Sequence, residues 1–236
     1  MKNILLLGAT GSIGDSALDV ISQNPESLNL YGMAFNSNID KALDIANKFF
    51  PDYAYIENSN HQKTLIEKVH AKTEILSGKD ELHNLLNDPK VDVIISAISG
   101  FSGLETTLMA AKTGKTILLA NKESIVVAGD IILPLAKEFN TNVIPIDSEH
   151  NAIFQCLVGE RAKEDVSKII ITASGGPFIN KSLDELEMVT KEQALKHPNW
   201  EMGSKISIDS ATLVNKCLEL IEAKYLFDLN EKFFKL

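Results

Sequence analysis

The chain has 236 residues, of which 44% are hydrophobic and 23% charged, enough apolar mass for one large or two modest folded domains. Its net charge of −9 disfavours nucleic acid and anionic membranes as partners, because proteins bind both through basic surfaces. Only two cysteines occur, Cys156 and Cys217, outside any C-x-x-C pattern. We therefore expect neither structural zinc nor a disulfide scaffold, and we expect both cysteines to be buried.

Strand and helix patterns alternate along the first 145 residues. The run after Met1 is too short and too quickly interrupted by glycine for a signal peptide, so we predict a first strand and a cytoplasmic protein. Apolar runs predict strands at 3–7, 28–35, 53–56, 73–76, 91–98, 115–120 and 142–146. Helical periodicity predicts helices at 13–23, 39–49, 61–69, 103–113 and 127–139. This alternation predicts an α/β fold with a doubly wound, mostly parallel, Rossmann-like sheet over residues 1–145.

A glycine pattern follows the first strand. Gly8, Gly11 and Gly14 form G-x-x-G-x-x-G at the start of a helix, where a dinucleotide pyrophosphate can approach the backbone closely. The alternative is a strand-to-helix turn that needs glycine only for packing. The second strand ends in Ala34-Phe35-Asn36-Ser37-Asn38, with no acid to hold a ribose hydroxyl, so NADP is favoured over NAD. The nearest cation, Lys41, is not a strong phosphate clamp.

The segment Asn121-Lys122-Glu123-Ser124 lies at the carboxyl end of another strand. Open α/β sheets bind ligands at the carboxyl ends of their strands, so Lys122 is a candidate for contacting a substrate hydroxyl or oxyanion. An exposed loop lysine is the alternative.

Beyond residue 145 the pattern changes. We predict one strand at 168–173, a Ser174-Gly-Gly-Pro turn, and a polar segment, with short helices possible at 183–195, that ends in His197-Pro-Asn-Trp200. A long polar segment of this kind is often a lid, and Trp200 is a plausible cover over a ligand. A helix is predicted at 211–227, and the apolar run 233–236 resembles the start of a strand.

Two acids follow the strand that ends at Ile146. Asp147 and Glu149 would project together from an extended chain, and Glu219 could add a third carboxylate, a set that suits Mg²⁺ or Mn²⁺. The alternative is a surface turn with capping acids. His150 is adjacent, but a lone histidine is more often structural than a ligand.

One face of the last helix carries mixed polar groups. Asn215, Lys216 and Glu219 share this face by their spacing. Ser174 and Ser210, the latter at the expected N-cap, would complete an anion pocket suited to a phosphate monoester. We expect the helix to pack through an apolar stripe that comprises Leu213, Cys217, Leu220 and Ile221.

Five motifs, in this order and spacing, resemble the 1-deoxy-D-xylulose 5-phosphate reductoisomerase family: GATGSIG, LANKES, IDSEHNAIFQ, ASGGPF and HPNWEMGSKISIDSATLVNKCLELIEA. The resemblance implies an NADPH- and divalent-metal-dependent oxidoreductase of the non-mevalonate (methylerythritol phosphate) route to isoprenoids. Its product would be 2-C-methyl-D-erythritol 4-phosphate. Residues 146–236 would be the first part of an α+β metal- and substrate-binding catalytic domain. Family members continue past residue 236 to complete that domain, form a homodimer and add a helical domain.

The resemblance also implies a role for individual residues. The metal ligands would be Asp147, Glu149 and Glu219, which with Lys122 form the catalytic set. Substrate contacts would come from Lys122, Ser148, Glu149, Ser174, His197, Trp200, Ser210, Asn215, Lys216 and Glu219. The NADPH site would be lined by Thr10, Gly11, Ser12, Ile13, Asn36, Ser37, Asn38, Asn121, Glu123 and Gly203, with Trp200 and Met202 in a mobile lid.

Two other functions remain open at this level. A different NADP-dependent dehydrogenase could use the same nucleotide domain, but it would need neither the carboxylates nor the serine-rich pocket. A chain that binds nucleotide without catalysis is the third possibility.

Overall fold

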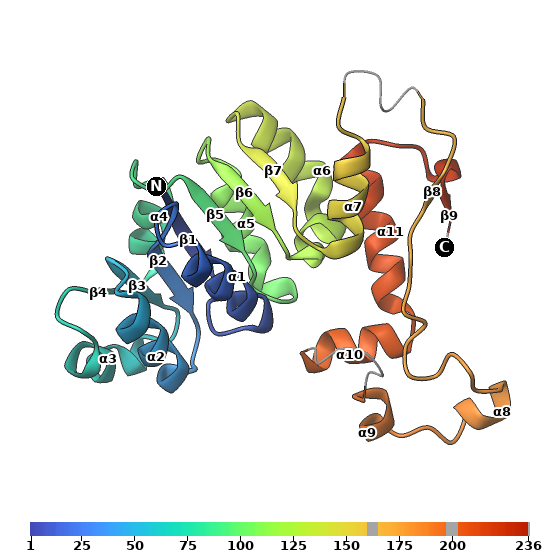
Figure 1. Cartoon of the computed structure of the whole chain (residues 1–236), viewed down its shortest axis with the longest axis horizontal. Helices are drawn as coiled ribbons and strands as arrows, with labels where there is room; N and C mark the ends of the chain where they lie inside the picture. The colour runs from blue at the N-terminus through green and yellow to red at the C-terminus, as the bar shows by residue number, and fades with distance from the viewer. Residues whose placement is uncertain (160–164, 197–202, 236) are drawn as a thin grey trace. The chain divides into compact units, whose positions relative to one another are not determined.

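The computed structural model describes residues 1–159, 165–196 and 203–235. The chain divides into two compact units, Met1–Ile146 and Asp147–Leu236. In Figure 1 the first unit runs from blue to yellow, ending with β7, and the second from yellow to red. Among the described residues, no helix combines the length and the apolar character needed to cross a membrane.

The first unit is built on a seven-stranded sheet in the order β4-β3-β2-β1-β5-β6-β7, with every neighbouring pair parallel. The strands are β1 Lys2–Leu7, β2 Leu28–Phe35, β3 Tyr53–Ile56, β4 Glu74–Leu76, β5 Val93–Ser96, β6 Thr116–Leu119 and β7 Asn142–Pro145. The strand order reverses between β1 and β5. Loops that leave the carboxyl ends of β1 and β5 therefore diverge, which creates the crevice where such sheets bind ligands.

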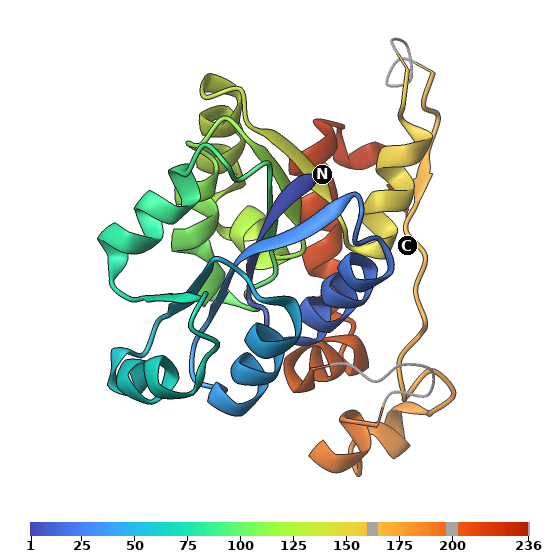
Figure 2. The same cartoon turned by 60° about the vertical axis from the view of Figure 1, so that its left-hand side comes forward.

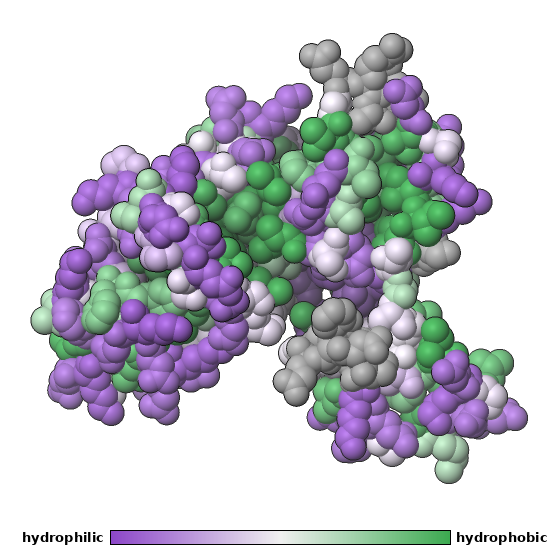
Figure 3. All heavy atoms as spheres, in the orientation of Figure 1, coloured by the Kyte–Doolittle hydropathy of each residue, from purple (hydrophilic) through white to green (hydrophobic). Residues whose placement is uncertain are grey.

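Helices cover both faces of this sheet (Figures 1 and 2). They are α1 Ser12–Gln23, α2 Ile39–Phe49, α3 Gln62–Lys68, α4 Lys79–Asn87, α5 Leu104–Ala110 and α6 Lys122–Glu138, with short 3₁₀ turns at Ser59–His61 and Phe101–Gly103. Hydrophilic side chains cover most of the visible surface over α2 and α3 (Figure 3). Charged outer faces and apolar inner faces are what amphipathic helices on a central sheet require.

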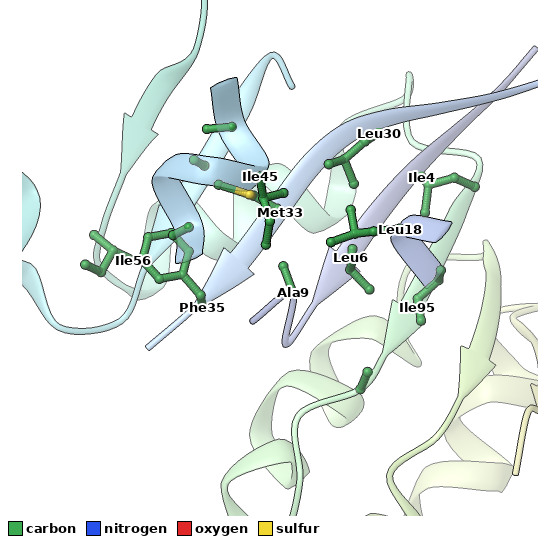
Figure 4. Packing of buried hydrophobic residues seen from close by; sticks show 14 of the residues in the cluster. Ile4, Leu6, Ala9, Leu18, Leu30, Met33, Phe35, Ile45, Ile56 and Ile95 are labelled. Carbon is green, nitrogen blue, oxygen red and sulfur yellow. The ribbon is translucent and has the colours of Figure 1, made fainter. Parts of the chain in front are cut away.

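Alternation along β1 shows why two layers of helices form. Ile4 and Leu6 join the core cluster that includes Leu18 of α1 and Ile45 of α2, shown in Figure 4. Leu5 and Leu7 are fully buried but lie outside that cluster, on the opposite side of the strand. A strand that is apolar at every position must be covered on both faces, which is typical of parallel sheets.

Strand and helix predictions for this unit agree closely with the structure, with two exceptions. Helix α4 was not predicted, although its buried residues Leu82, Leu85 and Leu86 have helical spacing. Helix α6 begins at Lys122, five residues before the predicted start at 127. The helix starts early because Asn121 caps it: the Asn121 Oδ1 accepts from the Ser124 backbone N–H at 2.8 Å.

The second unit holds mostly helices. Its elements are α7 Ser148–Cys156, β8 Ile169–Ile170, α8 Leu183–Leu186, α9 Lys191–Ala194, α10 Ser204–Ala211, α11 Val214–Phe227, a 3₁₀ turn at Glu231–Phe233 and β9 Phe234–Lys235. Strands β8 and β9 pair in parallel over two residues each. A small core joins Ile153 of α7 to Ala223 and Phe227 of α11 and to both strands. The α7–α11 pair is therefore the framework of this unit.

Three predictions for this unit need correction. The strand expected at 168–173 is only two residues long. The helix expected at 211–227 is two helices, broken at Leu213, whose left-handed backbone (φ 60°) no α-helix can contain. Ser210 therefore lies in the last turn of α10 and is not an N-cap.

Burial in this unit also differs from the prediction at several positions. Cys156 and Cys217 are exposed, as are Leu213 and Ile221 of the expected apolar stripe. The buried residues of α11 include Lys216, Glu219 and Glu222. Since this face packs toward α7, these polar side chains are enclosed, whereas Leu213, Cys217 and Ile221 are exposed and Leu220 alone of the expected stripe packs against the small core.

Candidate functional site

The glycine turn lies at the point where the strand order reverses. Gly8 follows β1 with φ 88°, and a Cβ there would stand 2.6 Å from the Ala97 carbonyl oxygen, just beyond β5. A Cβ on Gly14 would stand 2.4 Å from the Ala9 carbonyl oxygen. Both glycines therefore permit backbone contacts that no other residue allows. The exposed N-terminus of α1, from Gly11 onward, remains accessible for a pyrophosphate.

The expected adenosine end of this crevice is formed by exposed polar residues. Asn36, Ser37 and Asn38 directly follow β2, and Asn38 caps α2 by accepting from the Lys41 backbone N–H at 3.2 Å. The Lys41 ammonium donates to Asp15 of α1 at 2.7 Å. This ammonium is thus already partly neutralised, which fits the expectation that Lys41 is a weak phosphate clamp.

Asn121 and Lys122 are both buried, with 1% and 8% of their surface exposed. The Asn121 side-chain amide donates to the carbonyl oxygens of Ile98 and Gly100, at 2.5 and 2.9 Å. This ties the loop after β5 to the start of α6, and Glu123 lies in the first turn of that helix. Because it is buried, Lys122 is not the exposed loop lysine of the alternative interpretation. Buried lysines are rare and need partners.

Three carboxylates converge in the second unit. Each of Asp147, Glu149 and Glu219 offers an oxygen within 4.8 Å of the other two. Asp147 precedes α7 without capping it through its side chain, so the capping-acid alternative does not describe it. Glu149 lies in the first turn of α7 rather than on an extended chain, and Glu219 is on α11. The α7–α11 pairing therefore brings together acids that are far apart in sequence.

The Lys216 ammonium lies among these acids. It donates to Glu149 Oε1 at 2.9 Å and to Glu219 Oε2 at 2.5 Å. Its third bond is to the Thr172 carbonyl oxygen at 2.6 Å, so all three of its protons are used. Ser148 donates to Glu149 and Asn215 donates to Glu219, each at 2.5 Å. These bonds orient the carboxylates.

Electrostatics at the cluster favour bound positive charge. Burial opposes ionisation of Glu149, but hydrogen bonds from Ser148 and Lys216 outweigh it and lower its pKa to about 2. Burial likewise opposes the charge on Lys216, yet its hydrogen bonds to Glu219 and Glu149 raise its pKa. Three carboxylates against one ammonium leave two negative charges in excess, which matches a divalent cation. An all-oxygen donor set is what Mg²⁺ and Mn²⁺ prefer.

A polar turn lies beside this cluster. The Ser174 hydroxyl accepts from the Gly176 backbone N–H at 3.3 Å, and both Gly175 and Gly176 have positive φ. A Cβ on Gly176 would stand 2.8 Å from the Ser210 carbonyl oxygen, so the turn and the end of α10 lie in contact. Because Thr172 bonds Lys216, the same segment passes both Ser210 and the ammonium. Four of the expected phosphate contacts, Ser174, Ser210, Asn215 and Lys216, thus come from neighbouring segments.

Other predicted positions are placed less fully. Thr10, Gly11, Ser12 and Ile13 form the turn and first residues of α1, and Gly203 is the exposed residue before α10. His197, Trp200 and Met202 lie outside the described residues.

Family models account for most of the chain. Residues 4–129 match the model of 1-deoxy-D-xylulose 5-phosphate reductoisomerase, and residues 143–227 match that of its C-terminal domain. The chain belongs to this family. A relative from Clostridium tetani with the same name is 50% identical over 233 residues, and one from Vesicomyosocius okutanii is 45% identical over 232. The chain spans 60% of the length of each of these relatives.

Solved structures agree in fold. A reductoisomerase in complex with NADPH, fosmidomycin and magnesium is 43% identical, with a TM-score of 0.91 over 99% of this chain and 60% of its own. The enzyme from Zymomonas mobilis in complex with NADPH is 42% identical, with a TM-score of 0.89 and the same coverage. The predicted family and the α/β, mostly parallel fold are therefore confirmed.

Sequence reasoning did not select two groups that the structure places at the cluster. The Thr172 carbonyl oxygen could not have been found, because no side-chain pattern marks a backbone acceptor. Glu222 could have been, since it follows Lys216 and Glu219 at the same three-residue interval.

Proposed function

We propose that the chain provides the nucleotide- and metal-binding parts of an NADPH-dependent reductoisomerase that converts 1-deoxy-D-xylulose 5-phosphate to 2-C-methyl-D-erythritol 4-phosphate. One observation carries the proposal. Three carboxylates, an ammonium and a serine–glycine turn lie together in one unit of a chain that also has a dinucleotide-type glycine turn. A simple NADP-dependent dehydrogenase requires only the glycine turn, so the carboxylate cluster favours the reductoisomerase.

NADPH is proposed to bind at the α1 N-terminus and along the polar residues after β2. The close backbone approaches at Gly8 and Gly14 support this, because they hold the start of α1 tightly against the turn after β1, as in sheets that bind a pyrophosphate at a helix N-terminus. The absence of an acid at Asn36–Asn38 supports NADPH over NADH. The Lys41–Asp15 pair predicts that the preference is moderate.

Asp147, Glu149 and Glu219 are proposed to hold the divalent ion. When bound, such an ion supplies Lewis acidity that polarises the substrate ketone. Ser148 and Asn215 hold two of the carboxylates in orientation, and Lys216 bears positive charge at the border between the carboxylates and the Ser174–Ser210 turn. From there it would anchor the substrate phosphate. Binding energy far from the reacting carbons would then position them for rearrangement to an aldehyde and for reduction of that aldehyde by NADPH.

Lys122, His197 and Trp200 are proposed to contact the same substrate, and the whole protein is proposed to act as a homodimer. Both proposals rest on family membership, since the described residues contain no partner subunit. The oligomeric state is measured directly by sedimentation of the whole protein.

The test is metal-dependent turnover by the whole protein. With NADPH, Mg²⁺ and 1-deoxy-D-xylulose 5-phosphate, nicotinamide absorbance should fall, and chelation of the metal should stop it. Glu149→Gln should abolish this turnover, whereas Glu187→Gln, which removes an exposed acid of the same unit, should leave it unchanged. Turnover that survives both chelation and Glu149→Gln would refute the assignment and select a metal-independent dehydrogenase.

A further inference from the structure

A second buried acid–base pair lies directly behind the carboxylate cluster. His150 of α7 is fully buried, and Glu222 of α11 is 1% exposed. The His150 Nδ1 atom lies 3.2 Å from Glu222 Oε2 and 3.9 Å from Asp147 Oδ1. Neither residue is needed for the proposed chemistry, and Glu222 is not one of the three converging carboxylates. Buried polar groups in such a place require an explanation, because they are costly unless they have partners.

The opposite side of the His150 ring contacts the backbone of a proposed metal ligand. Nε2 lies 2.9 Å from the Glu219 carbonyl oxygen. A carbonyl can only accept, so Nε2 carries a proton and the ring donates to Glu219. His150 therefore connects α7, at the residue after Glu149, to α11, at the residue that supplies the third carboxylate.

Glu222 fixes the direction in which this ring points. With Nε2 held by Glu219, the second ring nitrogen faces the Glu222 carboxylate. The two atoms are in contact there, although their geometry is not that of an aligned hydrogen bond. Phe227, one turn further along α11, stacks on the ring at 6.5 Å between centroids and limits its tilt. The imidazole is thus held from two sides by α11.

We propose that Glu222 is a positioning residue for the metal site, and that it acts through His150. By holding the ring against Glu219, it sets the spacing between α7 and α11, and so the spacing of Asp147 and Glu149 from Glu219. Buried groups behind a metal site commonly orient the ligands in this way, and their loss typically weakens metal binding about 10- to 100-fold. The inference rests on the proposed function only in taking the three carboxylates as the metal ligands.

Mn²⁺ binding provides a test that needs neither substrate nor turnover. Free Mn²⁺ is followed by electron paramagnetic resonance as the ion is titrated into wild type, Glu222→Gln and His150→Gln, and the double variant. We expect each single variant to raise the Mn²⁺ dissociation constant about tenfold. We expect the double variant to be no weaker than either single one, because both changes break the same connection.

The double variant separates positioning from a simple charge effect. If Glu222 only contributed negative charge near the ion, its loss would weaken binding equally with or without His150, and the two effects would add. Glu231→Gln is the matched control: it removes an exposed acid of the same unit, and should leave the dissociation constant unchanged. A purely structural role would lower thermal stability while the folded protein kept its Mn²⁺ affinity.

The outcomes distinguish this inference from the proposed function. Unchanged Mn²⁺ affinity in folded Glu222→Gln, or additive effects in the double variant, would overturn the positioning role alone. If Glu222→Gln does not fold, His150→Gln by itself decides, since an unchanged dissociation constant there also overturns it. If wild type bound no Mn²⁺, or if Glu219→Gln bound it as well as wild type, the metal site and this inference would both fail.

Discussion

Replacing Gly14 by alanine should destabilise the first unit and weaken NADPH binding. A Cβ at Gly14 would stand 2.4 Å from the Ala9 carbonyl oxygen and 2.7 Å from that of Gly8. Both atoms belong to the backbone of the turn, so no side-chain rotation can relieve the overlap. The start of α1 must move away from the turn, and with it the N–H groups proposed to hold the pyrophosphate.

Two opposing effects set the magnitude. Overpacking of this kind costs about 1–3 kcal/mol. Alanine in a helix gains about 1 kcal/mol over glycine. The net loss should therefore be up to about 2 kcal/mol of unfolding free energy. If the shifted helix loses about 1.4 kcal/mol of interaction with NADPH, its dissociation constant rises about tenfold.

Urea unfolding followed by circular dichroism measures the first effect, and NADPH fluorescence measures the second. Ser16→Ala is the matched control, because Ser16 is an exposed residue of the same helix with only a 3.4 Å bond to the Ser12 carbonyl. It should leave both quantities nearly unchanged. The reasoning is refuted if Gly14→Ala is as stable as wild type and binds NADPH equally well.

Two further substitutions test the charge arrangement. Lys216→Met removes the ammonium that pairs with Glu219, which is 1% exposed, and should lower the unfolding free energy by about 3 kcal/mol. Thermal melts should then show that Mg²⁺ stabilises this variant more than it stabilises wild type. Equal stabilisation of the two proteins would contradict the charge argument. Asp92→Asn removes a carboxylate whose pKa is lowered by the Asn3 backbone N–H, a bond of 2.8 Å that outweighs burial, with Lys2 assisting. A carboxylate whose pKa is lowered in the folded state stabilises that state above the unfolded pKa of 3.8, and this stabilisation is lost as the pH falls through the folded pKa. The loss of unfolding free energy caused by Asp92→Asn should therefore be constant from pH 7 to 5 and shrink below about pH 4. A cost that grew in acid would show that the sign is wrong.

Much of the first unit could be predicted from local patterns. Continuous apolar runs such as Leu28–Phe35 and the helical spacing of Ile39–Phe49 define elements whose bounds the structure reproduces. The glycine turn was equally readable, because positive φ at Gly8 and the close approach at Gly14 restrict both positions to glycine. These features depend on contacts within a few residues, or on the parallel sheet that an alternation of strands and helices along the chain forms.

In the second unit, the burial of side chains and the convergence of the acids depend on tertiary contacts, so local patterns could not predict them. The sequence shows that Lys216 and Glu219 occupy one face of a helix and Cys217 another, but it does not show which face is buried. Packing against α7 encloses the charged face, because Glu149 and His150 supply partners for the ammonium and the Glu222 carboxylate. The same packing exposes Cys217 and Ile221. The identity of the acidic residues was thus determined by the sequence, whereas their convergence was decided by two helices that bury charge only where opposite charge meets it.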